Sequence, residues 1–185
     1  MKVTALSIPD ILLIEPKVFR DDRGFFFESF NQEDFEKRAN LAPIFVQENH
    51  SRSTKGVLRG LHYQLPPKSQ DKLLRVVKGE ILDVVVDIRK DSLTFGEWRG
   101  IYLSDSEIQQ IYMPHGFAHG FCVISDFADL HYKVSKFYSE DDEAGIFWND
   151  ERIGIQWPVQ NPIVSRRDAN HPILDERITE KSESL

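Results

Sequence analysis

A histidine stands in the middle of an apolar segment of the sequence. The segment 56–64 reads GVLRGLHYQ, and its Val, Leu and Tyr content predicts a β-strand. Strict alternation along a strand places His62 on the same face as Gln64 and places Arg59 on the opposite face. A lone histidine in such a place is most often a core residue whose ring nitrogens are satisfied by neighbours. Here several other predicted strands also carry polar groups on apolar faces, which favours a lined pocket.

Polar side chains from five predicted strands share one interior if those strands close into a barrel. They are Gln47, Asn49, His62, Lys72, His119 and Tyr132. Such a set offers acid–base chemistry without a metal, because it contains a base, a proton donor and a cation for a developing negative oxygen. His62 suits the base, since its reference pKa lies near working pH. Tyr132 suits the acid, Lys72 suits the cation, and Asp168 is a candidate to hold the imidazole in one tautomer.

Metal chemistry is the first alternative. The segment 112–120 reads YMPHGFAHG and contains His115 and His119 four residues apart, a spacing that suggests zinc when it occurs on a helix. A proline and two glycines argue against a helix there, and outside a helix this spacing carries little information. A site of His62, His119 and a carboxylate from elsewhere remains an alternative, although Gln64 is a poor ligand for transition metals.

Three arginines offer a place for an anion. Arg23, Arg59 and Arg167 lie at predicted turns or strand ends around the expected pocket. Taken singly, each is most simply a surface residue. Taken together, they suit a ligand that carries a diphosphate, because guanidinium groups bind phosphate oxygens in pairs.

Length and charge limit the class of protein. A chain of 185 residues fits one domain, residues 1–185, in which the residues after about 175 form a polar tail. The net charge of −7 argues against general binding of nucleic acid. The single cysteine, Cys122, has no partner for an internal disulfide, so we expect a reducing, cytoplasmic compartment. No stretch is long and apolar enough to span a bilayer, so we expect no membrane contact.

The pattern of elements predicts an all-β fold. Besides the strand around His62, strands are expected over 45–50, 72–77, 80–88, 98–103, 108–113, 119–124 and 128–137. The segments 72–77 and 80–88 read as a hairpin joined at Lys78-Gly79. A helix capped by Asn31 is expected to run to about Asn40. Many short strands with few short helices between them indicate an antiparallel barrel, most simply a jelly roll.

Ordered motifs over nearly the whole chain, up to about Leu174, resemble the dTDP-4-dehydrorhamnose 3,5-epimerases. They are RGFF (23–26), ESFN (28–31), QENHS (47–51), GVLRGLHYQ (56–64), the segment 72–79, PHGFAHGF (114–121), YK (132–133) and GIFWND (145–150). The resemblance implies a cupin jelly-roll barrel, a homodimer, and a reaction without cofactor or metal. It implies epimerisation at C3 and C5 of dTDP-4-dehydro-6-deoxy-D-glucose to dTDP-4-dehydro-L-rhamnose through an enolate, on the route to dTDP-L-rhamnose.

The resemblance also implies catalytic roles by position. His62 would be the proton acceptor, and Asp168 would be its partner in a dyad. Tyr132 would donate a proton on the opposite face of the sugar, and Lys72 would stabilise the oxygen at C4. His119 would line the sugar pocket.

The nucleotide would be held by a second group of residues. Tyr138 would stack on the thymine. Contacts to the nucleotide or its diphosphate would come from Arg23, Glu28, Gln47, Glu48, Asn49, Arg59, Glu143 and Arg167. The chain departs from the family pattern at Arg167, where a lysine is common, and over 135–137, where SKF replaces the usual TDY.

The positions of Arg59 and His62 conflict with a regular strand. Alternation places the two side chains on opposite faces, whereas the resemblance requires both near the ligand. Gly60 lies between them and would permit a bulge or bend that brings them together.

Three alternatives to the double epimerase stay open. The first is an epimerase that inverts only C3 or only C5 of a related sugar nucleotide. The second is a metal-dependent oxygenase of the cupin type. The third is a module that binds a nucleotide sugar without catalysis.

Overall fold

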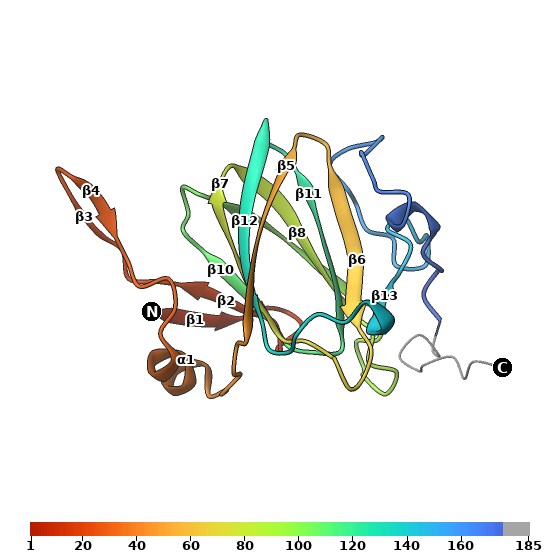
Figure 1. Cartoon of the computed structure of the whole chain (residues 1–185), viewed down its shortest axis with the longest axis horizontal. Helices are drawn as coiled ribbons and strands as arrows, with labels where there is room; N and C mark the ends of the chain where they lie inside the picture. Colours follow the sequence, from red (N-terminus) through yellow and green to blue (C-terminus); the bar gives the residue numbers. More distant parts are fainter. Residues whose placement is uncertain (176–185) are drawn as a thin grey trace.

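Two antiparallel sheets face each other and form the body of the molecule (Figure 1). The structure is a computed structural model that describes residues 1–175, and the polar segment expected after about residue 175 lies outside them. One sheet has six strands in the order β1-β2-β10-β7-β12-β5, and the other has five in the order β13-β6-β11-β8-β9. This arrangement confirms the predicted all-β, cupin-like jelly roll.

The strands of the six-stranded sheet are β1 (Lys2–Ala5), β2 (Leu12–Glu15), β5 (Gln47–Thr54), β7 (Lys72–Lys78), β10 (Gln110–Met113) and β12 (Phe127–Val134). Those of the five-stranded sheet are β6 (Leu58–Gln64), β8 (Glu80–Asp87), β9 (Trp98–Ser104), β11 (Phe117–Val123) and β13 (Glu143–Gly145). The strands β3 (Phe19–Asp21) and β4 (Gly24–Phe26) pair only with each other among the described residues and project from the body (Figure 1). The sequence did not indicate β1 or β13.

The strands β7 and β8 follow each other but lie in different sheets. β7 pairs with β10 and β12, whereas β8 pairs with β9 and β11. The predicted hairpin at Lys78-Gly79 is therefore wrong, although both of its strands exist. Gly79 has a φ of +87° and lies so close to the start of β12 that a Cβ would lie 2.1 Å from the Phe127 carbonyl oxygen. The chain turns a corner from one sheet to the other at this glycine.

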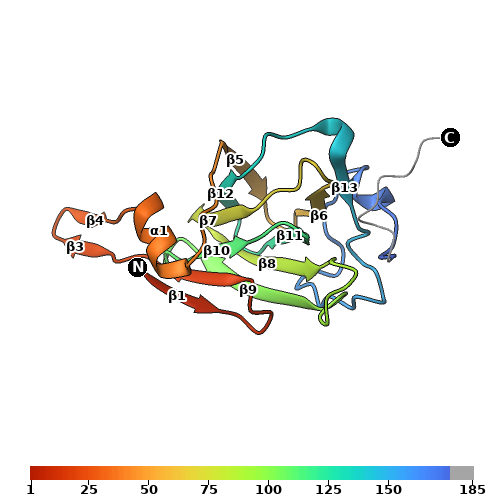
Figure 2. The same ribbon diagram turned by 90° about the horizontal axis from the view of Figure 1, so that it is seen from below.

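Apolar side chains fill the space between the sheets and also cover the outer face of the five-stranded sheet. The interior cluster includes Leu74 and Val76 of β7, and Val85 of β8. The outer cluster joins Val84 and Val86 to residues of the segment after β13, such as Ile146 and Ile155. In Figure 2 this blue C-terminal segment lies beside β6 and β13, at the end of the molecule opposite α1. Both faces of β8 are therefore buried.

The helix α1 (Gln32–Ala39) forms where the sequence predicts it. The Asn31 side chain accepts a hydrogen bond from the Asp34 backbone N–H at 3.1 Å, which satisfies a free donor of the first turn. Asn40 ends the helix in the left-handed region, with a φ of 54°. Phe35 is the buried side chain of the helix, and it packs against Tyr112 of β10.

Candidate active site

His62 and Arg59 line the same cavity because β6 carries one extra residue opposite β11. His119 pairs with His62 and Phe121 pairs with Arg59, so three steps along β6 match two steps along β11. An extra residue in one strand reverses the faces of the side chains beyond it. Gly60 lies at this bulge with a φ of +137°. The predicted bulge at Gly60 is confirmed.

His62 and Asp168 form a hydrogen-bonded pair. His62 Nε2 lies 2.9 Å from Asp168 Oδ1, while Asp168 Oδ2 accepts the Gly60 backbone N–H at 3.2 Å. Burial opposes ionisation of Asp168, but the hydrogen bonds from His62, Gly60 and Ser165 outweigh it and lower its pKa. An ionised carboxylate keeps the imidazole proton on Nε2. The other ring nitrogen, Nδ1, is then able to accept a proton.

A cavity of about 390 Å³ opens between the two sheets and collects most of the expected site residues. From the five-stranded sheet come Arg59, His62, His119 and Glu143, and from the six-stranded sheet come Gln47, Asn49, Lys72 and Tyr132. Tyr138 lies in the loop after β12 and also lines the cavity. The candidate base and the candidate acid thus stand on opposite sheets.

Lys72 brings a cation into this cavity from the start of β7. Its Nζ donates a hydrogen bond to the His62 carbonyl oxygen at 3.3 Å. Burial lowers the pKa of Lys72 to about 8, while the charges of Asp83 and Glu143 act in the opposite direction. At neutral pH the amine is therefore mostly protonated, and it can stabilise a negative oxygen.

Tyr132 keeps its proton over the neutral range. Its side chain lines the cavity from β12 and packs against the interior apolar cluster. Burial raises the pKa of Tyr132, the Arg59 charge opposes this rise, and the Glu143 charge adds to it. A phenol of raised pKa serves as a proton donor rather than as a base.

His119 is held by a carboxylate that sequence analysis did not include in the site. His119 Nε2 lies 2.8 Å from Asp83 Oδ2, and the Asp83 side chain is fully buried. Alternation along 80–88 is the signal that was available, since it places Asp83 opposite the apolar face of Leu82 and Val84. A carboxylate in the middle of a buried strand must find a partner. Here it fixes the orientation of a pocket histidine.

Several polar side chains form a hydrogen-bonded set at one edge of the cavity, which we call its mouth. The Tyr138 hydroxyl donates to Glu143 Oε2 at 2.5 Å, and Arg167 contacts the same oxygen at 2.6 Å. Gln47 accepts the Tyr138 backbone N–H at 3.0 Å and donates to Asn49 at 2.9 Å. These contacts hold an aromatic ring, a guanidinium and two amides together beside Glu143, which lines the cavity.

Four of the expected substrate contacts do not line this cavity, and one of them, Arg167, reaches it only through its contact with Glu143. Glu48 faces outward from β5 and pairs with Lys133 at 3.0 Å. Arg23 forms an ion pair with Asp21 in the β3–β4 hairpin. Glu28 follows that hairpin and lines a different cavity beside α1. Within this chain, the side chains of Glu48, Arg23 and Glu28 do not join His62.

His171 is a neighbour of the dyad that the sequence did not reveal. Within residues 1–175, His62, Asp168 and His171 bring three metal-type donor atoms within 4.8 Å of one another. His119 belongs to its own pair with Asp83, so the earlier alternative of a site built from His62 and His119 receives no support from this cluster. His171 lies far from His62 in the sequence. Only the fold could therefore reveal that His171, and not His119, lies beside the dyad.

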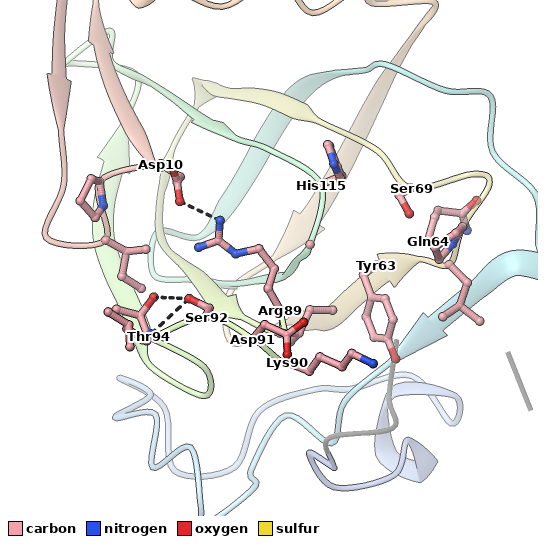
Figure 3. Close-up of a pocket in the computed structure, with 17 residues that line it drawn as sticks. Asp10, Tyr63, Gln64, Ser69, Arg89, Lys90, Asp91, Ser92, Thr94 and His115 are labelled. Carbon is pink, nitrogen blue, oxygen red and sulfur yellow. Dashed lines mark hydrogen bonds and ion pairs between the residues drawn. The ribbon is translucent and has the colours of Figure 1, made fainter. Parts of the chain in front are cut away.

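A larger cavity of about 680 Å³ lies elsewhere, and Figure 3 shows its lining. Its wall is mostly apolar, and its principal cation is already neutralised. Arg89 reaches Asp10 at 2.7 Å and Asp87 at 2.7 Å. Neither the His62–Asp168 dyad nor the Tyr132 phenol lines this cavity. The smaller cavity is therefore the candidate active site.

The comparisons with known proteins agree with this site. A family profile described as dTDP-4-dehydrorhamnose 3,5-epimerase matches residues 5–176. The chain is 58% identical over 170 residues to the dTDP-4-dehydrorhamnose 3,5-epimerase of Shigella flexneri, covering 92% of this chain and 94% of the relative. Among the described residues, no helix is both long and apolar enough to cross a membrane.

Solved structures give the same result. The dTDP-6-deoxy-D-glucose-3,5-epimerase of Legionella pneumophila, in complex with dTDP-4-keto-L-rhamnose, superposes with a TM-score of 0.90 and 44% identity, over 94% of this chain and 92% of that one. A 3′-monoepimerase of Streptomyces bikiniensis, in complex with dTDP-quinovose, superposes with a TM-score of 0.88 and 34% identity, over 96% of this chain and 89% of that one. The chain belongs to the dTDP-4-dehydrorhamnose 3,5-epimerase family.

Proposed function

We propose that this protein converts dTDP-4-dehydro-6-deoxy-D-glucose to dTDP-4-dehydro-L-rhamnose by inverting C3 and C5. One observation carries the proposal: a His62–Asp168 dyad from one sheet and the Tyr132 phenol from the other line a single cavity. Inversion needs a base and an acid on opposite faces of the sugar, and the two sheets supply them. The family supports the same reaction, and so does the ligand of the Legionella structure, dTDP-4-keto-L-rhamnose, which is the product of that reaction.

The reaction begins with the acidity of the sugar. The C4 ketone acidifies the C–H bonds at C3 and C5, which flank it. His62 Nδ1 accepts one of these protons, and the negative charge moves to the oxygen on C4. Lys72 meets that charge, and Tyr132 returns a proton from the other side. A positioned acid–base pair contributes about 10²–10⁴-fold, and an oxyanion donor about 10²–10³-fold more.

The mouth of the cavity is the proposed nucleotide site. Arg59 and Arg167 would bind the diphosphate, since guanidinium groups match phosphate oxygens. Tyr138 would stack on the thymine, and the amides Gln47 and Asn49 would complete the contacts. The protein would be a single domain of residues 1–185 with one cysteine, Cys122, which is free and buried. A free cysteine together with a nucleotide-sugar ligand favours a cytoplasmic enzyme.

We also propose a homodimer in which the β3–β4 hairpin completes the partner's site. Phe19, Phe25 and Phe26 of this hairpin are 52%, 58% and 66% exposed, and the hairpin projects away from its own β6 (Figure 1). Exposed aromatic clusters of this kind mark association surfaces. An exchanged hairpin would carry Arg23 and Glu28 to a cavity that they do not reach within one protomer.

Mixing two impaired variants tests the exchange. In a heterodimer of His62→Asn and Arg23→Ala chains, exchanged hairpins leave one site with both residues intact, whereas unexchanged hairpins leave none. We expect the kcat/KM of the mixture to exceed that of either variant alone. Additive activity of the two parents would contradict the exchange.

Solvent exchange tests the reaction itself. In D₂O the wild-type enzyme should place deuterium at both C3 and C5 of the sugar, and His62→Asn should lose both signals while it still binds dTDP. Deuterium at C3 alone would favour the monoepimerase, the activity of the Streptomyces bikiniensis neighbour. Binding of the nucleotide sugar with no exchange at either carbon would refute catalysis.

A further inference from the structure

His171 is a half-buried histidine with a buried Nε2 atom, and the proposed reaction does not use it. Its Nε2 lies 3.9 Å from Asp168 Oδ1, the oxygen that also contacts His62 Nε2 at 2.9 Å. The His171 side chain is 11% exposed, and its Nε2 has no hydrogen-bond partner among residues 1–175. A buried ring nitrogen without a partner is costly, so its presence calls for an explanation.

The protein backbone makes room for this ring. Gly145 of β13 pairs with His62, and a Cβ at Gly145 would lie 2.4 Å from His171 Nε2. Immediately after the histidine, the Pro172 carbonyl oxygen accepts the Phe147 backbone N–H at 2.7 Å. The imidazole is thus seated against a glycine and anchored by the next residue, which keeps it beside the dyad.

The three donor atoms have the spacing of a transition-metal site. Zinc binds imidazole nitrogen and carboxylate oxygen at about 2.0–2.2 Å, so neighbouring ligand atoms of a tetrahedral ion lie about 3.4 Å apart. The distances from Asp168 Oδ1 to the two ring nitrogens, 2.9 and 3.9 Å, bracket that value. Two imidazoles and a carboxylate are also a donor set that zinc accepts.

We propose that His62, Asp168 and His171 bind a divalent transition-metal ion, with Zn²⁺ as the type case, and that the bound ion stops catalysis. The ion takes the lone pair of His62 Nε2, so the remaining proton of the neutral ring must sit on Nδ1. Nδ1 then has no lone pair with which to accept a proton from the sugar. The inhibitory part of this inference rests on the proposed function, whereas the binding part does not.

The ion would act without occupying the sugar site. Asp168 and His171 do not line the substrate cavity, and the metal donors lie on the side of His62 that faces Asp168. The substrate can therefore bind while the base is blocked. Inhibition should lower kcat and leave KM nearly unchanged.

Titration of the tag-free enzyme with CoCl₂ tests binding alone. Wild type should take up one Co²⁺ per chain and develop the visible absorption of a low-coordinate Co²⁺–imidazole site, which ZnCl₂ should displace. His171→Asn should weaken binding by at least about tenfold, since even indirect partners of metal ligands contribute about 10–100-fold. His171→Gln is the second variant, in case the first folds poorly. A wild-type titration without this spectrum would overturn the proposal.

A surface pair supplies the matched control. His115 contacts Asp71 at 2.9 Å, but its side chain is 69% exposed and lies outside the substrate cavity. His115→Asn should keep the wild-type stoichiometry and spectrum. If His115→Asn removes the spectrum and His171→Asn does not, the ion binds at the surface and the proposal is wrong.

Rates with and without ZnCl₂ test inhibition within each protein. Wild type should lose most of its kcat at one equivalent of Zn²⁺, whereas His171→Asn should keep a ratio close to one. Binding to wild type without loss of kcat would overturn the inhibitory role. If the proposed epimerase reaction itself fails, the Co²⁺ spectrum still decides whether the site exists.

Discussion

The pKa of Lys72 makes the proposed reaction testable by pH. The amine lies in the substrate cavity, within 3.3 Å of the His62 carbonyl oxygen. Burial lowers its pKa to about 8, and the nearby carboxylates of Asp83 and Glu143 only partly offset that effect. A lysine is charged below its pKa. The cation that should stabilise the enolate oxygen is therefore lost as the pH rises through 8.

The size of the effect follows from the titration. With a pKa of about 8, roughly 90% of Lys72 is protonated at pH 7 and roughly 10% at pH 9. If only the protonated form is active, kcat/KM should fall about tenfold between these two values. kcat/KM is the appropriate quantity because it reports the pKa values of the free enzyme.

Lys72→Met separates this cation from other groups that titrate in the same range. Loss of one oxyanion donor should lower kcat by about 10²–10³-fold, which corresponds to about 2.7–4 kcal/mol of transition-state stabilisation. The residual activity should no longer fall between pH 7 and 9. Lys133→Met is the control, since Lys133 faces outward from β12 and pairs with Glu48. A flat wild-type profile, or the same alkaline fall in Lys72→Met, would refute the assignment.

The same argument predicts an opposite effect on stability. Because folding lowers the pKa of Lys72, the protonated amine opposes folding below about pH 8, and this penalty fades as the pH rises toward 10.5. The full shift corresponds to about 3 kcal/mol, and access of water to the cavity reduces it to about 2 kcal/mol. Lys72→Met should therefore raise the free energy of unfolding at pH 7. Urea unfolding measures it, and a destabilised variant would contradict the burial argument.

Three further predictions address the acid, the fold and the bulge. Tyr132→Phe should still exchange deuterium at C3 and C5, because the base remains, but should form inverted product about 10²-fold more slowly by NMR. Burial would raise the pKa of Asp87, but hydrogen bonds from Arg89 and two hydroxyl groups lower it to about 2. Stability in urea should therefore fall as the pH drops from about 4 to 2, and Asp87→Asn should lose about 2 kcal/mol at pH 7. Gly60→Ala should lose at least about 1–3 kcal/mol by the same assay, since its Cβ would lie 2.6 Å from Gly120 Cα.

Local signals in the sequence predicted the elements well. The cap at Asn31 and the length of α1 depend on residues within one or two turns, and both were correct. Alternation also located strands such as β7 and β12, because a half-buried strand needs an apolar residue at every second position. The short strand β13 was missed because its three residues, Glu143–Gly145, are too few to show a period.

The pairing of strands depends on residues far apart in the sequence, and the hairpin predicted at Lys78-Gly79 was therefore wrong. Lys78-Gly79 between two apolar runs looks like a hairpin turn, yet the same residues serve as a corner between sheets. A glycine with positive φ suits both structures. The choice depends on β12 and β11, which come about 40 residues later and pair with β7 and β8. No window around Gly79 contains that information.

Residues of the site could be predicted only where a sequence motif or the family resemblance included them. The resemblance proposed that Asp168 accompanies His62, and the structure places them 2.9 Å apart. Asp83 and His171 were missed because each becomes significant only through a contact with a distant strand or loop. Arg23, Glu28 and Glu48 remain predictions, since the fold of this chain does not bring them to the cavity.

Gly60 shows how one residue can decide the composition of the site. Val57 packs toward the interior cluster, and Arg59 lines the cavity on the same side. Beyond the bulge, Leu61 packs outward and His62 faces inward, so the inward positions change from odd to even. A regular strand would place either the guanidinium or the imidazole in the cavity, but not both. The extra residue at Gly60 thus lets one seven-residue strand present a guanidinium and an imidazole to the same cavity.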